Sequence, residues 1–408
     1  GPQGQAAKPG ATASPTQVLK PEGPDSGLYI AHLGNASASN ESALYKIDYQ
    51  TGKVLWKYQF KLSHPDNTWG SYAPPNDLIV QQGMVFVTSF DASYVYSAYA
   101  ITASTGQLAW SHPFDSSVEL VRGQISMPVL SQGIYYITGV IDKNPDGDLL
   151  YALDARTGKL LQTYHSVRGF TIQNNVLYTS DLDSGPIKAT DLNNGQVLWE
   201  KRIGTNGQPL LAPSVAGEFF EAPFVLQNRV YLRANDQNAD EYKSSLYAFD
   251  TTSGQLIFHS PVMTTESPVT DVPFSDTMIV SGVIGDSLFA LNPANDNLLW
   301  SKKAGFAGNL AISGKDIYAT FDPHPFSPLN APDASGIMSL DGATGSLIWQ
   351  KIIASGGPSI SGLLVYQSIL YINQGTVTQG YRTTAMDMSG KVLWKISLGG
   401  YTSEVLVP

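Results

Sequence analysis

One pattern of strand, tight turn and strand recurs eight times along this chain of 408 residues. Its first copy spans Leu44 to Trp56 and reads LYKIDYQTGKVLW. Within the turn, Asp48 can accept hydrogen bonds from backbone amides, and Gly52 can adopt the positive φ that a short hairpin loop requires. A repeated hairpin of this kind restricts the chain to folds assembled from many copies of one small antiparallel sheet.

The copies end at residues 56, 110, 162, 199, 258, 300, 349 and 394, so their mean spacing is about 48 residues. A strand-rich period of roughly 40 to 50 residues is typical of propeller blades. Two further short strands precede most of the hairpins. The sequence therefore predicts an all-β fold, an eight-bladed β-propeller of four-stranded antiparallel blades. Only three strands precede the second blade, so we expect residues 402–408 to complete the first blade and close the ring.

The repeated pattern A-x-D-x-x-T-G-x-x-x-W resembles the tryptophan-docking motif of the PQQ-like (quinoprotein-type) β-propeller repeat family. The resemblance covers nearly all of residues 27–408. This family includes quinoprotein dehydrogenases, assembly scaffolds and sensor ectodomains, so the resemblance implies the fold and leaves the activity open. In blade number and size the chain is similar to the barrel-assembly outer-membrane lipoproteins, and it also resembles the propeller ectodomains of bacterial receptor kinases.

Composition separates a terminal segment from the repeats. Residues 1–26 are rich in Gly, Pro, Ala, Ser and Gln, which predicts a flexible linker or stalk, and residues 27–408 are expected to form a single propeller domain.

A formal net charge of −10 and the lack of a Lys/Arg run argue against nucleic acid as a partner. The chain has no cysteine, which excludes disulfides and thiolate metal sites, and no apolar run long enough to span a membrane.

Six tryptophans end copies of the repeat, and we expect each to pack between neighbouring blades as a structural residue. They are Trp56, Trp110, Trp199, Trp300, Trp349 and Trp394. Gln162 and Phe258 stand at this position in blades 3 and 5, and blade 6 has Asn292 and Asp296 in place of the usual Asp and Gly of the turn. Looser blade interfaces are expected at these places.

Loop lengths predict which face of the propeller binds a partner. With the strands of a blade called A to D from the axis outward, the B–C and D–A loops share one face and carry the insertions. These are residues 61–75, 113–124, 142–148, 205–218, 235–244 and 322–335. Candidate ligand residues on this face are Trp69, Tyr72, Arg122, Phe219 and Phe220. Trp69 and Tyr72 could form an aromatic platform for a peptide, a sugar or a flat cofactor; the alternative is a loop that packs on itself.

The segment from Asp142 to Asp148 has oxygen ligands at alternate positions. Asp142, Asn144, Asp146 and Asp148 resemble the first half of a calcium loop. The twelfth position is Leu153, where such a loop needs a bidentate Glu, and the alternative is a plain hairpin turn. We therefore expect no cofactor and keep Ca²⁺ as an open alternative.

The sequence favours a non-catalytic extracytoplasmic binding, scaffold or sensor module, monomeric and tethered through its N-terminal linker. Its partner would be a protein, peptide or glycan on the B–C/D–A loop face. No residue is assigned a catalytic role. The alternative is a PQQ- and Ca²⁺-dependent quinoprotein dehydrogenase. The members of the family with that activity are much longer and usually carry a vicinal disulfide, so PQQ is disfavoured here.

Overall fold

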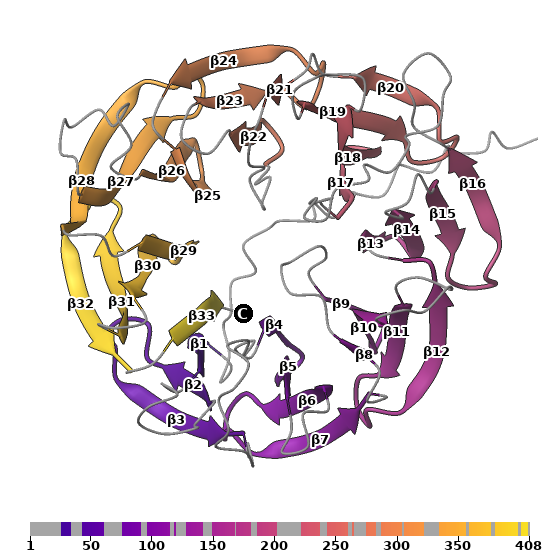
Figure 1. Cartoon of the computed structure of the whole chain (residues 1–408), viewed down its shortest axis with the longest axis horizontal. Helices are drawn as coiled ribbons and strands as arrows, with labels where there is room; N and C mark the ends of the chain where they lie inside the picture. The colour runs from indigo at the N-terminus through magenta and orange to yellow at the C-terminus, as the bar shows by residue number, and fades with distance from the viewer. Residues whose placement is uncertain are drawn as a thin grey trace, which may run out of the picture.

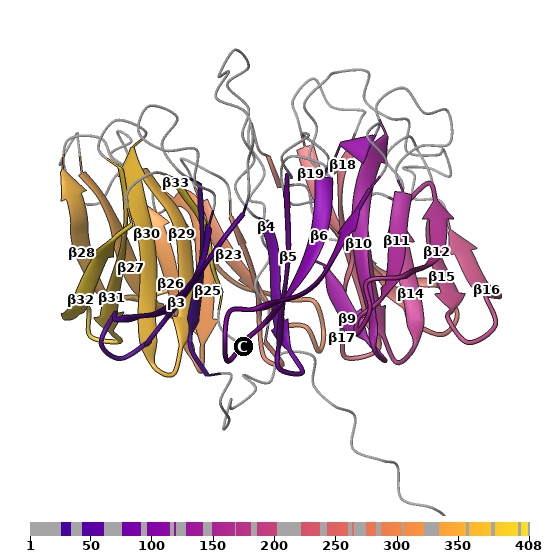
Figure 2. The ribbon, with the colours of Figure 1, turned by 90° about the horizontal axis from the view of Figure 1, so that it is seen from below.

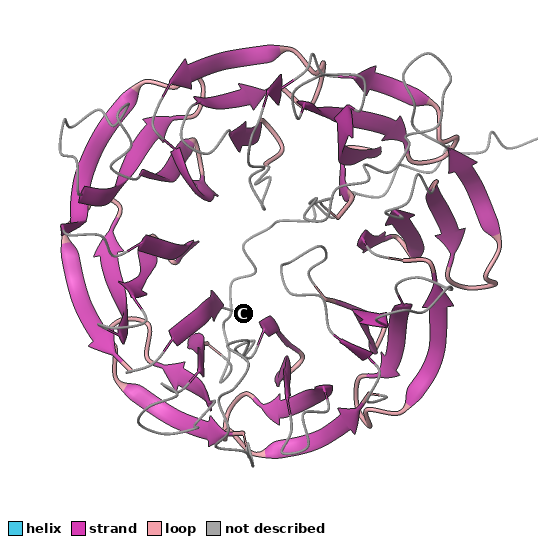
Figure 3. Cartoon of the chain, in the orientation of Figure 1, coloured by secondary structure: helices cyan, strands magenta, loops and turns pink. Residues whose placement is uncertain are grey.

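The structure is a computed structural model, and the description below covers most of the strands and the short turns between them. The described residues are 26–33, 43–60, 76–90, 96–114, 118–119, 128–141, 149–167, 169–180, 186–201, 222–236, 243–259, 263–264, 275–282, 287–303, 306–321, 334–355, 359–376, 380–398 and 401–406. Within them the chain forms strands and turns and no helix (Figure 3). The all-β prediction is confirmed.

Eight antiparallel sheets stand around a central axis, so the predicted eight-bladed β-propeller is confirmed (Figure 1). Seen from the side, the strands run from one face of the ring to the other (Figure 2). The strands of each blade are named here A to D from the axis outward. The D strands form the rim of the ring and the A strands surround its axis (Figure 1).

The first four blades contain strands β1 to β16 together with β33. Blade 1 consists of β33 (Tyr401–Leu406), β1 (Leu28–Leu33), β2 (Ala43–Ile47) and β3 (Val54–Gln59). Blade 2 consists of β4 (Asn76–Gln81), β5 (Met84–Phe90), β6 (Tyr96–Thr102) and β7 (Leu108–Pro113). Blade 3 consists of β9 (Val129–Ser131), β10 (Ile134–Ile141), β11 (Leu149–Asp154) and β12 (Leu160–His165), with β8 (Val118–Glu119) also paired to β10. Blade 4 consists of β13 (Gly169–Gln173), β14 (Val176–Ser180), β15 (Ile187–Asp191) and β16 (Val197–Lys201).

The remaining blades contain strands β17 to β32. Blade 5 consists of β17 (Phe224–Leu226), β18 (Arg229–Asp236), β19 (Lys243–Asp250) and β20 (Leu256–His259), with β21 (Met263–Thr264) also paired to β19. The described part of blade 6 consists of β22 (Ile279–Gly282), β23 (Ser287–Leu291) and β24 (Leu298–Lys303). Blade 7 consists of β25 (Phe306–Ser313), β26 (Asp316–Phe321), β27 (Ala334–Asp341) and β28 (Leu347–Ser355). Blade 8 consists of β29 (Ser359–Tyr366), β30 (Ile369–Thr376), β31 (Gly380–Asp387) and β32 (Val392–Ser397).

The two ends of the chain meet in blade 1. Strand β33 pairs antiparallel with β1, with Tyr29 opposite Leu406 and Leu33 opposite Tyr401. The last strand of the sequence is thus the innermost strand of the first blade, as the repeat count predicts. This pairing occupies a β1 edge that would otherwise present free backbone groups for aggregation.

Two kinds of short turn join strands at one edge of the ring. Several A–B turns have two central residues with positive φ, such as Gln82 at 55° and Gly83 at 77°, which is the type I′ geometry of tight hairpins. The C–D turns hold the repeated Asp and Gly. Beside each C–D turn the strand register shifts by one residue, as between Lys46 and Ile47. This β-bulge strengthens the local twist of the outer strand pair.

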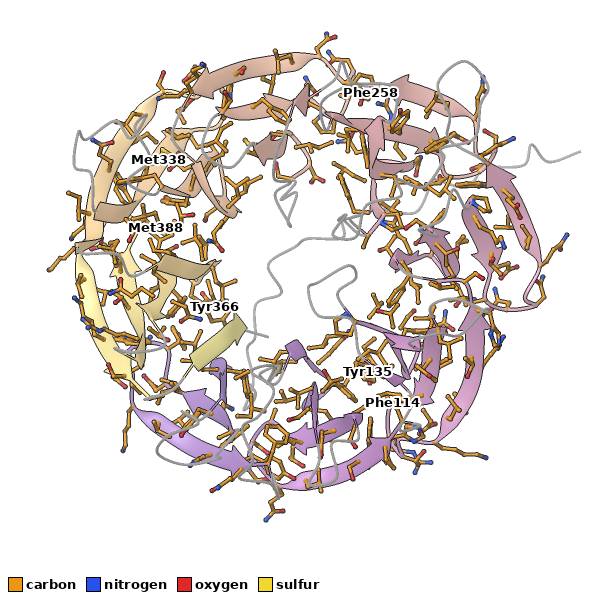
Figure 4. All side chains as sticks on the ribbon, in the orientation of Figure 1. Phe114, Tyr135, Phe258, Met338, Tyr366 and Met388 are labelled. Atoms are coloured by element: carbon orange, nitrogen blue, oxygen red, sulfur yellow. The ribbon has the colours of Figure 1, made fainter. Side chains whose placement is uncertain are left out.

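The core consists of separate hydrophobic clusters between neighbouring blades. At the interface of blades 2 and 3, Phe86, Trp110, Phe114 and Tyr135 belong to one buried cluster. Figure 4 shows side chains filling the space between the blades around the ring, with Phe114 and Tyr135 labelled at this interface. Each blade therefore gains most of its burial from its two neighbours.

Candidate functional site

Among the described strands, those joined by short turns meet at one edge of the propeller, and the longer stretches of sequence between strands begin and end at the other edge. We call the first the turn edge and the second the connection edge. On the turn edge, β4 ends at Gln81 and β5 begins at Met84. On the connection edge, β16 ends at Lys201 and β17 begins at Phe224. The lengths of the longer connections predict a binding face at the connection edge.

Buried polar side chains concentrate in the halves of the B and C strands nearer the connection edge. Ten of the thirteen buried polar or charged residues among those described lie there, namely Thr88, Ser89, Ser97, Thr179, Ser180, Thr320, Ser335, Asn373, Gln374 and Thr383. In blade 8, Thr383 Oγ1 donates to Asn373 Oδ1 at 2.7 Å. Gln374 Oε1 is buried and has no hydrogen-bond partner within the described part of the chain. The ring is therefore more polar inside towards this edge than towards the turns.

The candidate ligand residues from the sequence lie outside the described residues. This applies to Trp69, Tyr72, Arg122, Phe219 and Phe220, and to the candidate metal ligands Asp142, Asn144, Asp146 and Asp148. Strand β10 ends at Ile141 and β11 begins at Leu149, so the candidate calcium segment joins the B and C strands of blade 3. Both groups of assignments remain predictions. Residues 1–25, most of the predicted linker, also lie outside the described part.

The described residues contain neither a metal-binding cluster of side chains nor a helix that could cross a membrane. No group of three or more His, Asp or Glu side chains in the described ranges lies close enough together to hold a metal ion. The same ranges contain no helix of the length and apolarity needed to cross a membrane.

At the turn edge, six blade interfaces share one geometry built around a tryptophan. Trp110 of blade 2 is 7% exposed, and its Nε1 donates to Ala155 O in the C–D turn of blade 3 at 2.8 Å. Its ring lies directly over Gly158 of the same turn, which has a φ of 71°. A β-carbon at Gly158 would lie 2.5 Å from the indole. The indole therefore both anchors the next blade and requires a glycine there.

The other five tryptophans make the same hydrogen bond to the next blade. The Nε1 atoms of Trp56, Trp199, Trp300, Trp349 and Trp394 donate to the carbonyls of Ala103, Thr251, Gly342, Met388 and Tyr49, at distances of 2.7 to 3.0 Å. The bond from Trp394 to Tyr49 joins blade 8 to blade 1. One kind of contact is thus repeated around the ring and across its closure.

Carboxylates of the repeated turns are engaged in holding those turns. Asp154 Oδ1 accepts from Thr157 Oγ1 at 2.7 Å and from the Thr157 amide at 2.8 Å. The side-chain hydrogen bond from Thr157 is the main cause that lowers the pKa of Asp154, and backbone hydrogen bonds lower it further. Asp48 and Asp341 have pKa values lowered in the same way by Thr51 and Thr344. These acids serve the fold of the turn.

The interface of blades 5 and 6 uses an ion pair in place of the tryptophan. Arg229 of blade 5 pairs with Asp296, which occupies the glycine position of the blade 6 turn with a φ of 59°. Tyr231 Oη donates to Asp296 Oδ1 at 3.2 Å, and its pKa rises to about 12, chiefly through burial. Phe258, at the tryptophan position, is half-buried and packs on the neighbouring hydrophobic cluster. That this interface is looser stays a prediction; the structure adds a polar contact that the sequence pattern did not reveal.

Arg229 was missed because its position, the first residue of a B strand, is not part of the repeat. Two departures from the pattern in the same pair of blades, Phe258 and Asp296, were the available signal. An acid in place of a glycine that normally contacts an indole indicates a basic partner. The sequence alone does not say which of the nearby cations supplies it.

The sequence of the chain is similar to those of two groups of known proteins. A family model described as outer membrane protein assembly factor BamB matches residues 24–186, 202–305 and 242–406. BamB of Moranella endobia is 25% identical over 289 residues, covering 67% of this chain and 66% of that protein. BamB of Yersinia pestis is 26% identical over 363 residues, covering 80% of this chain and 84% of that protein. Quinoprotein ethanol dehydrogenase of Pseudomonas putida is 28% identical over 171 residues, covering 38% of this chain and 25% of the enzyme.

The chain spans just under two thirds of the Moranella protein and a quarter of the quinoprotein. Among solved structures, dihydro-heme d1 dehydrogenase NirN superposes with a TM-score of 0.65 at 9% identity, over 96% of this chain and 77% of that one. This last likeness concerns the fold alone. The family match extends over nearly the whole ring, and the chain therefore belongs to the family described as outer membrane protein assembly factor BamB.

Proposed function

We propose that this chain is a non-catalytic scaffold that binds a protein partner at its connection edge during the assembly of outer-membrane proteins. The observation that carries the proposal is the contrast between the two edges. Interface contacts repeat around the turn edge, whereas the strand ends at the other edge are separated by connections of very different lengths. A rigid ring with variable connections on one face is the usual arrangement of a binding protein.

The family supports the assembly role over the other binding roles. Relatives that match over most of this chain are named as assembly factors, and the proposal transfers that role to this chain. It places the protein outside the cytoplasm, tethered through residues 1–26. A peptide or glycan ligand and a sensor function are the remaining alternatives on the same edge.

Photo-crosslinking from the two edges tests the proposal. A photoreactive phenylalanine would replace Gln59, Lys201 or Ser397, which are exposed at the D-strand ends nearest the connection edge. Matched controls would carry it at Gln50, Thr252 or Ser389, which are exposed in C–D turns. We expect crosslinks to outer-membrane assembly proteins in cells from the first group alone. Equal crosslinking from both groups, or crosslinking from the turns alone, would contradict the proposed face.

The quinoprotein alternative rests on matches to a limited part of such enzymes. Thermal unfolding with PQQ, Ca²⁺ or both separates the two functions, since a ligand of the folded state raises the melting temperature. We expect no rise with PQQ. A rise with PQQ that requires Ca²⁺ would refute the scaffold function, and a rise with Ca²⁺ alone, lost in Asp146→Ala, would establish a metal site at residues 142–148.

A further inference from the structure

The interface of blades 3 and 4 lacks the indole that fills the equivalent place in six other interfaces. The residue at the tryptophan position is Gln162, whose side chain is exposed. Gly195, in the facing turn of blade 4, has a φ of 72°, and nothing in the described part of the chain lies within 4 Å of where its β-carbon would be. At the filled interfaces, the equivalent β-carbon would lie between 2.5 and 3.2 Å from the indole. As far as the described residues go, the space over Gly195 is therefore open.

Two groups that contact an indole elsewhere are present around this space. The first is a backbone carbonyl. Leu192 occupies the turn position of Ala155, and its amide donates to Asn175 O at 3.0 Å, as the Ala155 amide donates to Gly133 O at 2.9 Å. Ala155 O accepts a hydrogen bond from the indole N–H of Trp110. Leu192 O accepts no hydrogen bond from the described residues.

The second group is an aromatic wall. In blade 2, Phe86 lies opposite Ala100, which lies opposite Trp110, and the two rings are 6.0 Å apart. Tyr136 occupies the same place in blade 3, since it lies opposite Ala152, which lies opposite Gln162. Four further tryptophans have a tyrosine at this register position, with ring centroids 5.8 to 6.1 Å apart.

Tyr136 and a second phenol, Tyr164, adjoin the open place. Tyr136 is buried, and burial raises its pKa to about 12, with a smaller contribution from the neighbouring Tyr164. Tyr164 lies two residues beyond Gln162 on β12, so both side chains are on the same face of that strand. It packs against the cluster that also holds Tyr136 and Leu192. We call the place bounded by Tyr136, Leu192 O and Gly195 the 3/4 socket.

We propose that the 3/4 socket is a binding site for the tryptophan side chain of a partner protein. The occupant follows from the molecule itself, because the six equivalent places each hold an indole, five of them beside an aromatic ring at the register position of Tyr136. A flat ring can cover Gly195 where no β-carbon intervenes, and its N–H can donate to Leu192 O. Tyr136 is only 3% exposed, so it can contact such a ring only through the small exposed part of its side chain. The site lies at the turn edge, so it does not depend on the scaffold function proposed for the connection edge.

An arginine is the other planar donor that such a place could hold. The interface of blades 5 and 6 shows how this fold accommodates one: Arg229 pairs with an acid, Asp296, at the glycine position. The 3/4 socket retains Gly195 at that position and offers no acid there. Without a counter-charge, desolvation of a guanidinium is unfavourable, which favours the neutral indole.

Saturation-transfer NMR on the whole chain with N-acetyl-tryptophanamide tests the site. The variant Gln162→Trp supplies the missing indole from the chain itself, and Gln162→Ala is the matched control. We expect the probe to bind the native chain and Gln162→Ala, and its signal to fall at least about fivefold in Gln162→Trp. The 1-methyl analogue cannot donate to Leu192 O, and we expect it to bind several-fold more weakly than the parent probe.

Several outcomes would overturn the proposal. These are no signal with the native chain, an undiminished signal in Gln162→Trp, or stronger binding of N-acetyl-argininamide than of the tryptophan probe. Thermal unfolding gives a second measurement, since an indole that fits the socket should raise the melting temperature of Gln162→Trp by about 2 °C or more. A lower melting temperature than that of Gln162→Ala would show that the socket does not accept an indole.

Discussion

The indole contact at the turn edge can be measured by placing the same substitution in a filled and an open interface. Gly158 faces Trp110 and has a φ of 71°, whereas Gly195 faces the open socket and has a φ of 72°. Alanine at either position meets the same backbone strain, because L-residues are disfavoured at positive φ. The difference between Gly158→Ala and Gly195→Ala therefore reports the clash with the indole alone.

The expected magnitudes follow from these two environments. Backbone strain, partly offset by the reduced freedom of the unfolded chain, should cost about 1 kcal/mol in both variants. In Gly158→Ala the new β-carbon would also lie 2.5 Å from Trp110 Cε3, well inside ordinary contact distance. The indole is held by its bond to Ala155 O, so it has to shift or lose that bond, at a further cost of about 1–3 kcal/mol.

Urea unfolding followed by far-ultraviolet circular dichroism gives the free energy of unfolding of each variant. Gly133→Ala is a further control, since its φ is 76°, it lies in an A–B turn, and nothing described lies within 4 Å of its β-carbon position. We expect Gly195→Ala and Gly133→Ala to agree, and Gly158→Ala to be less stable by about 1–3 kcal/mol. Values for Gly158→Ala and Gly195→Ala within about 0.5 kcal/mol of each other would refute the proposed clash.

Three further perturbations test other contacts of the ring. Trp110→Phe should lower the free energy of unfolding by about 1–3 kcal/mol in the same urea assay, because it leaves Ala155 O without its donor. Arg229→Ala should lower it by about 3 kcal/mol, since the buried Asp296 loses its partner, and the double variant with Asp296→Gly should recover part of this loss. Deletion of residues 401–408 removes the pairing of β33 with β1 and should cost roughly 5 kcal/mol and promote aggregation measured by light scattering, whereas deletion of residues 1–25 should leave stability unchanged.

The architecture could be predicted from the sequence because its determinants are local and repeated. The turn around Asp48 and Gly52 needs particular residues at fixed positions, and eight copies in register make a chance match implausible. The closing role of the C-terminal strand followed from counting strands in the first blade. Both conclusions rest on the backbone pattern, which side-chain variation between blades does not change.

The partners of individual side chains could not be predicted in the same way. Arg229 lies far from Asp296 in sequence, and only the packing of blade 5 on blade 6 brings them together. The openness over Gly195 is a similar case, because it depends on Gln162, which comes from a different blade. The ligand residues of the connection edge are also hard to predict from the sequence, because they lie on connections whose sequences follow no repeat.

The two exceptional interfaces divide the ring unequally. Blades 4 and 5 are joined by Trp199, whose Nε1 donates to Thr251 O at 2.8 Å. On one side this pair meets the open 3/4 socket, and on the other it meets the ion pair of Arg229 and Asp296. The remaining blades, from 6 through 8 and on through 1 to 3, are connected by an unbroken series of indole contacts. Because the repeated contact is absent from both boundaries of blades 4 and 5, a change in the packing at these boundaries would break no indole hydrogen bond.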